Sequence, residues 1–187
     1  MENRKLLVGI DAGFVATGIS IFDVTKGCIF VTANCIRTEK SLKKRSIRVA
    51  DDDSERVKNI IIGLDEMIKK YNKNGNKFFV AVELPTGGAQ GARPNRTMGI
   101  ITGAIVAFTT LRNLPVEWVT PAEVKVAVSG NKSASKDEIM DKIRRMLSNY
   151  SDELPKAKKH FEHIADSVGV VLHTRKHSQM YKFFINN

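Results

Sequence analysis

The chain has 187 residues, of which 42% are hydrophobic, as expected for one globular domain with a substantial core. No apolar stretch approaches the length of a transmembrane helix, and the first strand follows the N-terminus directly, so we expect neither a membrane span nor a secretory signal. The net charge of +10 favours a polyanionic partner, and nucleic acid comes ahead of anionic lipid because no basic amphipathic helix stands out.

Three strands are predicted at the start of the chain. Lys5–Ile10 is mostly apolar, and Thr17–Phe22 and Cys28–Ile36 follow after short turns, an order typical of an antiparallel meander. The first strand ends in Asp11, and the turn after it contains Gly13. Ligands often bind at the C-terminal end of a strand, so this acid is either a metal ligand or a turn residue.

A helix and a second buried strand come next. The segment 37–48 is rich in Lys and Arg and is expected to be a loop or the approach to a helix. Apolar residues at helical spacing over 57–68 predict the helix, and we interpret Asp51–Asp53 as its acidic N-terminus rather than as a metal site. Phe78–Val82 predicts a strand buried on both faces, which ends at Glu83. Two apolar strands therefore terminate in a carboxylate.

Helices are expected to dominate the second half. Thr120 before Pro121 and Ser135 three residues before Glu138 are helix-start signals. We predict one domain over residues 1–176 and a C-terminal tail, 177–187, of unclear structure. In chain order we expect a loop at 84–96, a helix at 97–111, a strand at 116–119, the two capped helices, a polar break at 148–155 and a last helix at about 158–173.

His163 and Asp166 are three residues apart and so share one face of the last helix. Asp166 could simply be hydrogen bonded in the core and His163 solvated, but a buried acid is costly unless it is paired or bound to a metal. If a parallel crossover places the strand of Glu83 beside that of Asp11, four candidate ligands meet.

Oxygen-rich clusters of this kind bind Mg²⁺ or Mn²⁺. Two such ions roughly 4 Å apart can activate a water and stabilise the leaving oxygen of a phosphodiester. In this interpretation Asp11 bridges two ions per active site, Glu83 and Asp166 each hold one side, and His163 is a ligand or orients the attacking water. Together with the positive charge, the cluster predicts a nuclease.

Four stretches in this order resemble the RuvC-type Holliday junction resolvases of the ribonuclease H-like superfamily. They span most of the chain: Gly9-Ile10-Asp11-Ala12-Gly13 with Thr17-Gly18, Val80-Ala81-Val82-Glu83, Thr120-Pro121-Ala122-Glu123-Val124-Lys125 with Ala134-Ser135-Lys136, and His163-Ile164-Ala165-Asp166-Ser167.

The resemblance implies an α/β, ribonuclease H-like fold with a five-stranded mixed sheet of order 3-2-1-4-5 flanked by helices. It also implies a homodimer that nicks two opposed strands of a four-way DNA junction during recombination and repair. Lys125 and Lys136 match positions that contact DNA phosphates in the family, although each could be an ordinary surface lysine. We also predict DNA contacts for Lys132, Arg93 and Arg96.

One departure bears on specificity. Many relatives carry an aromatic wedge after the second acid, whereas residues 84–96 contain no aromatic residue. A broader branched-DNA (flap or fork) endonuclease is therefore one alternative, and a non-catalytic branched-DNA-binding protein is another. Actin-like ATPases share the strand–acid–turn start but need two such lobes. The two cysteines predict a reducing cytoplasm, bacterial or, for a phage-encoded protein, that of the host.

Overall fold

The computed structural model describes residues 3–41, 47–72, 75–85 and 91–187. Five strands form one mixed sheet of order β3-β2-β1-β4-β5, which confirms the predicted fold class and strand order. β1 and β2 pair antiparallel, as do β2 and β3, whereas β4 runs parallel to both β1 and β5. The strands are β1 (Lys5–Asp11), β2 (Ala16–Asp23), β3 (Ile29–Arg37), β4 (Lys77–Glu83) and β5 (Val116–Val119).

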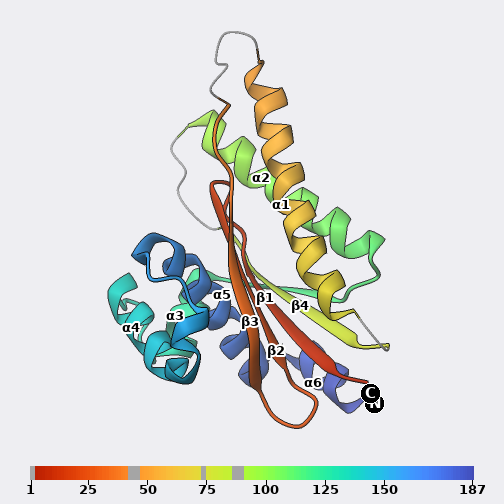
Figure 1. Ribbon diagram of the computed structural model, residues 1–187, viewed down its shortest axis with the longest axis vertical. Coiled ribbons are helices and arrows are strands. Elements are labelled where there is room, and N and C mark those ends of the chain that lie inside the picture. The colour runs from red at the N-terminus through yellow and green to blue at the C-terminus, as the bar shows by residue number, and fades with distance from the viewer. Residues whose placement is uncertain (1–2, 42–46, 73–74, 86–90) are drawn as a thin grey trace.

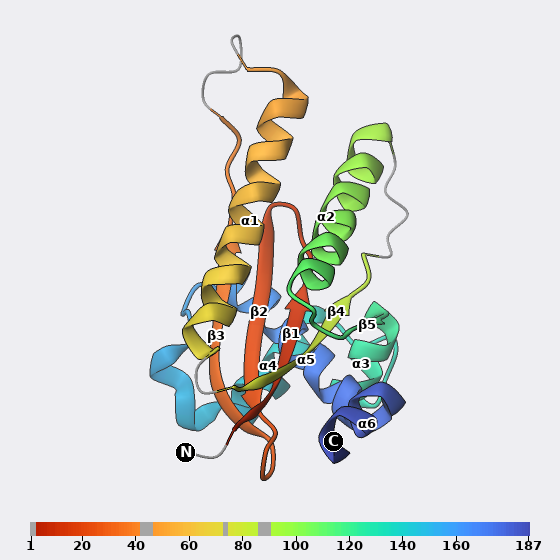
Figure 2. The ribbon, with the colours of Figure 1, turned by 90° about the vertical axis from the view of Figure 1, so that its right-hand side faces the viewer.

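Helices cover both faces of the sheet (Figure 1, Figure 2). Two long helices pack on one face, and the remaining helices pack on the other. In the described part of the chain, no helix combines the length and apolar character that a bilayer crossing needs. The helices are α1 (Val49–Tyr71) and α2 (Ala92–Leu111) on the first face, and α3 (Pro121–Ser129), α4 (Lys136–Met146), the 3₁₀ helix η1 (Ser148–Glu153), α5 (Lys158–His177) and α6 (Gln179–Asn186) on the second.

Side-chain alternation along β1 determines which way its terminal acid faces. Val8 and Ile10 are buried in the core beneath α1 and α2. Leu7 belongs to the opposite core, beneath α5, and Gly9 faces the backbone of α5. Since successive side chains point to opposite faces, Asp11 lies on the α5 side of the sheet.

Helix α5 approaches the sheet at two glycines. A Cβ on Gly9 would overlap the carbonyl oxygen of Ser167, and a Cβ on Gly18 would overlap that of His163. Gly18 is the register partner of Asp11 in β2. The missing side chains therefore let the helix backbone lie directly against the strand ends that carry the site.

Helix α2 begins at Ala92 rather than at Thr97, so the predicted loop is shorter than expected. Its first turn is held by Asp53 of α1, which is only 1% exposed and forms ion pairs with Arg93 and Arg96. The acidic start of α1 is confirmed for Asp51 and Asp52, but Asp53 has this additional, long-range role. The basic residues at 42–46 and the loop residues at 86–90 lie outside the described residues.

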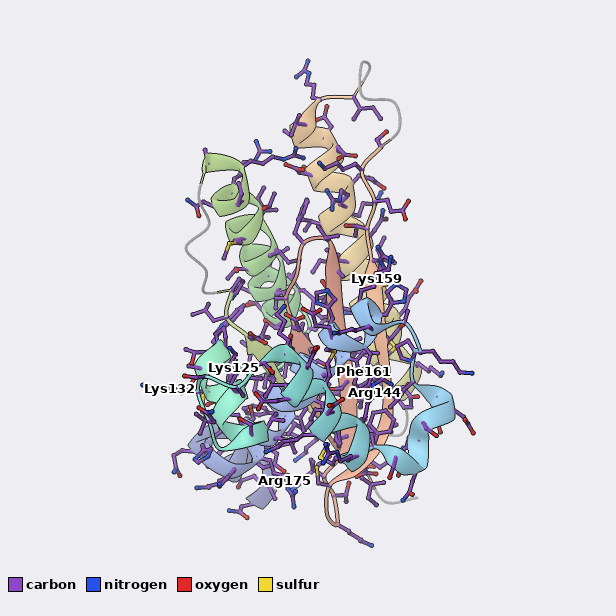
Figure 3. The ribbon with its side chains drawn as sticks, turned by 90° about the vertical axis from the view of Figure 1, so that its left-hand side faces the viewer. Lys125, Lys132, Arg144, Lys159, Phe161 and Arg175 are labelled. Atoms are coloured by element: carbon purple, nitrogen blue, oxygen red, sulfur yellow. The ribbon has the colours of Figure 1, made fainter. Side chains whose placement is uncertain are left out.

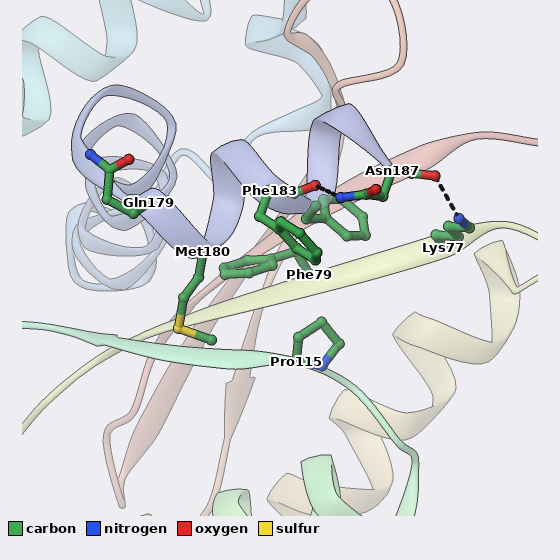
Figure 4. A pocket seen from close by; sticks show the side chains of 8 residues that line it. Lys77, Phe79, Pro115, Gln179, Met180, Phe183 and Asn187 are labelled. Carbon is green, nitrogen blue, oxygen red and sulfur yellow. Dashed lines mark hydrogen bonds between the residues drawn. The ribbon is translucent and has the colours of Figure 1, made fainter.

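The C-terminal tail, for which no structure was predicted, contains a helix. Ser178 caps α6 by accepting a hydrogen bond from the backbone of Tyr181, whose ring contacts Phe79 of β4. Phe184 packs on the same ring. Figure 4 shows the apolar pocket that α6 forms with β4 and the chain before β5.

Replacing Gly18 with Ala should separate α5 from β2. We expect G18A to lower the free energy of unfolding by roughly 1–3 kcal/mol, because the added methyl group meets backbone that cannot rotate away. The matched control is G103A in α2, where an added Cβ meets nothing within 4 Å. It should raise helix stability by up to about 1 kcal/mol. Urea unfolding measures both; equal stability of the two variants would contradict the close approach.

Candidate active site

Two carboxylates stand side by side at the ends of adjacent strands. Asp11 of β1 and Glu83 of β4 are register partners in the parallel ladder, as the nuclease interpretation requires. Phe79 and Ala81, which precede Glu83 at alternate positions, are buried in the core beneath α5. Glu83 therefore faces the same side of the sheet as Asp11.

Helix α5 adds two more groups to these acids. His163 Nδ1 lies 2.6 Å from Asp11 Oδ2, and this hydrogen bond raises the pKa of His163. In the neutral imidazole, donation from Nδ1 to the carboxylate leaves Nε2 as the nitrogen with a lone pair. Asp166 follows on the same helix face and is largely buried. Its negative charge raises the pKa of both Glu83 and His163.

Burial and mutual repulsion make two of the acids hard to ionise. The pKa of Glu83 rises to about 8, first through burial and then through the charges of Asp11 and Asp166. The pKa of Asp166 rises to about 7, again through burial and then through Asp11. Such raised values mark a group of like charges that share a poorly solvated space.

The donor set fits a hard divalent cation. Glu83 Oε2 is buried and has no hydrogen-bond partner within the described residues, so the fold leaves one carboxylate oxygen in need of a positive partner. Carboxylate oxygens with one imidazole are ligands that such cations accept. In residues 3–41, 47–72, 75–85 and 91–187, no three acidic, His or Cys side chains converge tightly enough to form a ready-made coordination shell. Repulsion among unneutralised carboxylates opposes such convergence.

Two of the predicted DNA-binding lysines face the acids. Lys136, at the start of α4, forms an ion pair with Glu162 and lowers the pKa of both Glu83 and Asp166. Lys125 of α3 also lowers the pKa of Glu83. Their charges therefore act on the site itself, and their contact with DNA stays a prediction.

Lys132 is exposed in the connection between α3 and α4, and its side chain projects outward (Figure 3). The predicted arginines lie on the other side of the sheet, where Asp53 pairs with both Arg93 and Arg96. For all three residues, DNA contact stays a prediction.

Two acids with roles near the site were not identified from the sequence. Glu162, adjacent to His163, pairs with Lys136 and so ties α5 to α4. The sequence predicts Asp53 only as part of the acidic start of a helix. The available signal for Glu162 is its position immediately before the motif His163–Ser167 of α5. For Asp53, the signal is an acid on the apolar stripe of α1, four residues before Val57.

Paired strand-end acids, completed by a helix that packs across them, define a carboxylate site on a ribonuclease H-like α/β fold. Residues 7–173 match the family model described as "Crossover junction endodeoxyribonuclease RuvC". The chain belongs to this family.

Individual relatives agree with the family model. The chain is 32% identical over 145 residues to the crossover junction endodeoxyribonuclease RuvC of Salinibacter ruber, covering 76% of this chain and 73% of that protein. It is 30% identical over 148 residues to that of Dechloromonas aromatica, covering 76% and 72%. Thermus thermophilus RuvC in complex with a Holliday junction substrate has a similar fold, with a TM-score of 0.69, 21% identity and coverage of 94% and 96%.

Replacing Glu83 with Gln should change how stability depends on pH in metal-free protein. Glu83 binds a proton in the folded state up to about pH 8 but loses it near its ordinary value of 4.5 when unfolded. The folded state therefore holds more protons across that window, and wild-type stability falls as pH rises through it. The variant lacks this loss, so E83Q should exceed wild type at pH 8 by on the order of 1–3 kcal/mol, since one pKa unit corresponds to about 1.4 kcal/mol.

Urea unfolding with a chelator present, at pH 5 and at pH 8, measures this difference. The two proteins should be closer in stability at pH 5, where the folded carboxyl is already protonated. A constant difference at both pH values would contradict the raised pKa.

Proposed function

We propose that this protein is a metal-dependent, structure-specific endonuclease that nicks four-way DNA junctions in recombination and repair. The observation that carries the proposal is the in-register pair Asp11 and Glu83, completed by His163 and Asp166 of α5, in a chain of the RuvC family. A protein that only binds branched DNA has no need for such a cluster of carboxylates, in which the ionisation of Glu83 and Asp166 is costly.

Each of the three acids has a different proposed role as a cation ligand. Asp11, hydrogen bonded to His163 and beside Glu83, would be the ligand common to two Mg²⁺ or Mn²⁺ ions, and Glu83 and Asp166 would each be a ligand of one of them. When bound, the ions supply activation of a water molecule and stabilisation of the leaving 3′ or 5′ oxygen. Glu83 and Asp166 must lose their protons to act as ligands. The affinity of the site for the cations should therefore increase with pH.

His163 is placed to act on the water molecule that attacks the phosphodiester. Its Nδ1 is fixed by Asp11, which determines the orientation of the ring. Nε2 would then either be a ligand of an ion or orient the attacking water. Lys136 and Lys125 place positive charge beside the acids, where the DNA phosphates arrive, and Lys132 extends this charge outward.

A homodimer fits the proposed substrate. A four-way junction presents two equivalent strands, and two copies related by a two-fold axis present two equivalent sites. Thermus thermophilus RuvC forms a complex with a Holliday junction substrate, which supports the junction as the substrate here. The cytoplasm of a bacterium, or of a phage's host, is the proposed location; both described cysteines are free.

The absence of an aromatic residue from 84–96 supports a second candidate, a branched-DNA endonuclease with broader selectivity. The full chain should be incubated with Mg²⁺ and a four-way junction, a flap, a fork and a linear duplex built from shared strands. We expect paired nicks in the junction at a rate at least ten times that on the linear duplex. Cutting of the flap or fork with the junction left intact would replace the resolvase proposal with the second candidate.

Replacing Asp166 with Asn should separate binding from cleavage. The amide preserves the shape of the side chain but is a much poorer cation ligand, so D166N should lose at least 100-fold in junction cleavage. Its junction affinity, measured with a chelator, should stay within about threefold of wild type, because phosphate contacts dominate binding. Undiminished cleavage would show that the metal site lies elsewhere.

A further inference from the structure

A cavity of about 410 Å³ opens beside the active site, next to the turn between β1 and β2. His163, which is hydrogen bonded to Asp11, lines one side of it, and Gly13 and Phe14 of the turn line another. Figure 2 shows this turn between the long helices α1 and α2. The volume lies within the roughly 300–1,000 Å³ of typical small-ligand sites.

The walls of the cavity carry positive charge. Lys40, Arg56 and Arg93 line it, and no Asp or Glu does so among the described residues. The remaining surface is largely apolar and includes Val15 and Pro94. A cationic wall facing an apolar one suits an anion that carries a hydrophobic or aromatic group.

Arg56 is a buried wall residue of the cavity, and its position is fixed by contacts with neighbouring residues. Its side chain is only 5% exposed, its guanidinium lies 4.1 Å from the ring centroid of Phe14, and its Nε donates to Thr38 Oγ1 at 3.0 Å. Its Nη2 also donates a long hydrogen bond, of 3.5 Å, to the carbonyl oxygen of Phe14. Within residues 3–41, 47–72, 75–85 and 91–187, no carboxylate forms an ion pair with it. A buried cation with only neutral partners is costly, and an arriving anion would offset that cost.

Asp53 holds Arg93, the second positively charged residue of the cavity wall, in place. It lies one helical turn before Arg56 on α1 and holds Arg93 at 3.0 Å across the gap to α2. Because Asp53 also pairs with Arg96, its single charge is shared between two arginines and leaves an excess of positive charge. Arg93 lines the cavity and its side chain is 43% exposed, so it can hold Asp53 and still meet a ligand.

We infer that this cavity binds one nucleotide of the DNA strand beside the scissile phosphate. Lys40 and Arg93 contact its phosphate, Arg56 supplies the buried charge behind them, and Phe14 and Val15 contact its sugar or base. The inference rests on the proposed nuclease function, because His163 links the cavity to the cleavage site. The cavity would thereby select the backbone path of the strand on the side of the sheet opposite Lys125 and Lys136.

The test is junction binding in a chelator across a series of salt concentrations. R93Q and K40Q should each weaken binding by about 5–10-fold at 0.15 M salt. Each should also reduce the slope of log affinity against log salt by about one, as loss of one phosphate contact requires. The matched control is R112Q, which also removes an exposed arginine of the α2 end paired with an α1 acid, Asp65, but lies outside the cavity. Its affinity and slope should match wild type.

Position is tested with junctions that carry a single uncharged methylphosphonate, moved through the three phosphates on each side of the nick. One location should weaken wild-type binding by about 5–10-fold and have no further effect on R93Q, which identifies the coupled pair. Equal slopes for R93Q and R112Q, or the absence of any coupled location, would overturn the inference. Wild-type cleavage of the unmodified junction, measured alongside, tests the proposed function separately.

Discussion

The site depends on how closely helix α5 lies against β1 and β2. The imidazole of His163 reaches Asp11 because Gly9 and Gly18 place no side chain between the helix backbone and the strands. A third glycine, Gly169, faces Val124 of α3 in the same tight manner, so α5 is confined on both sides. The apolar residues of α5 around the site are buried as a result. Tight packing of this kind gives a helix one position, which is the accuracy that a set of catalytic ligands needs.

This packing also concentrates charge that the fold does not neutralise. Asp11, Glu83 and Asp166 share one end of the sheet, and Lys136, whose charge acts on both Glu83 and Asp166, is partly engaged by Glu162. The pKa values of Glu83 and Asp166 rise first because both groups are buried, and then because protonation relieves the repulsion among the acids in metal-free protein. Cations relieve it while leaving the acids ionised. In the proposed function, the crowding of acids that weakens the metal-free fold would also be what favours cation binding.

Local patterns were sufficient to predict the strands and the acids at their ends. The apolar run of β4 and the capping residues Thr120 and Ser135 act over a few residues, so the sequence displays them directly. The neighbour relation of Asp11 and Glu83 came from family resemblance, since a parallel pairing leaves no local trace. The early start of α2 and the helical tail depend on contacts distant in sequence: Asp53 with Arg93, and Phe79 with the rings of α6. Such contacts join residues that are far apart in the sequence, so local sequence patterns do not reveal them, and they can override local propensity.

The two helical layers contribute to the site in different ways. The α5 layer supplies His163 and Asp166, whereas α1, on the opposite face, extends beyond the sheet and reaches the turn after Asp11 through Arg56 (Figure 1). Asp53, on the same face of α1, holds the start of α2 in the segment that follows Glu83. Helix α1 thus anchors two segments, the turn that follows Asp11 and the start of α2 that follows Glu83. Without an aromatic wedge in 84–96, the shape of the bound DNA must be recognised by other surfaces, and these two anchored segments follow the two acids along the chain. Selectivity would then arise from the path that the backbone takes past the acids, rather than from an inserted ring.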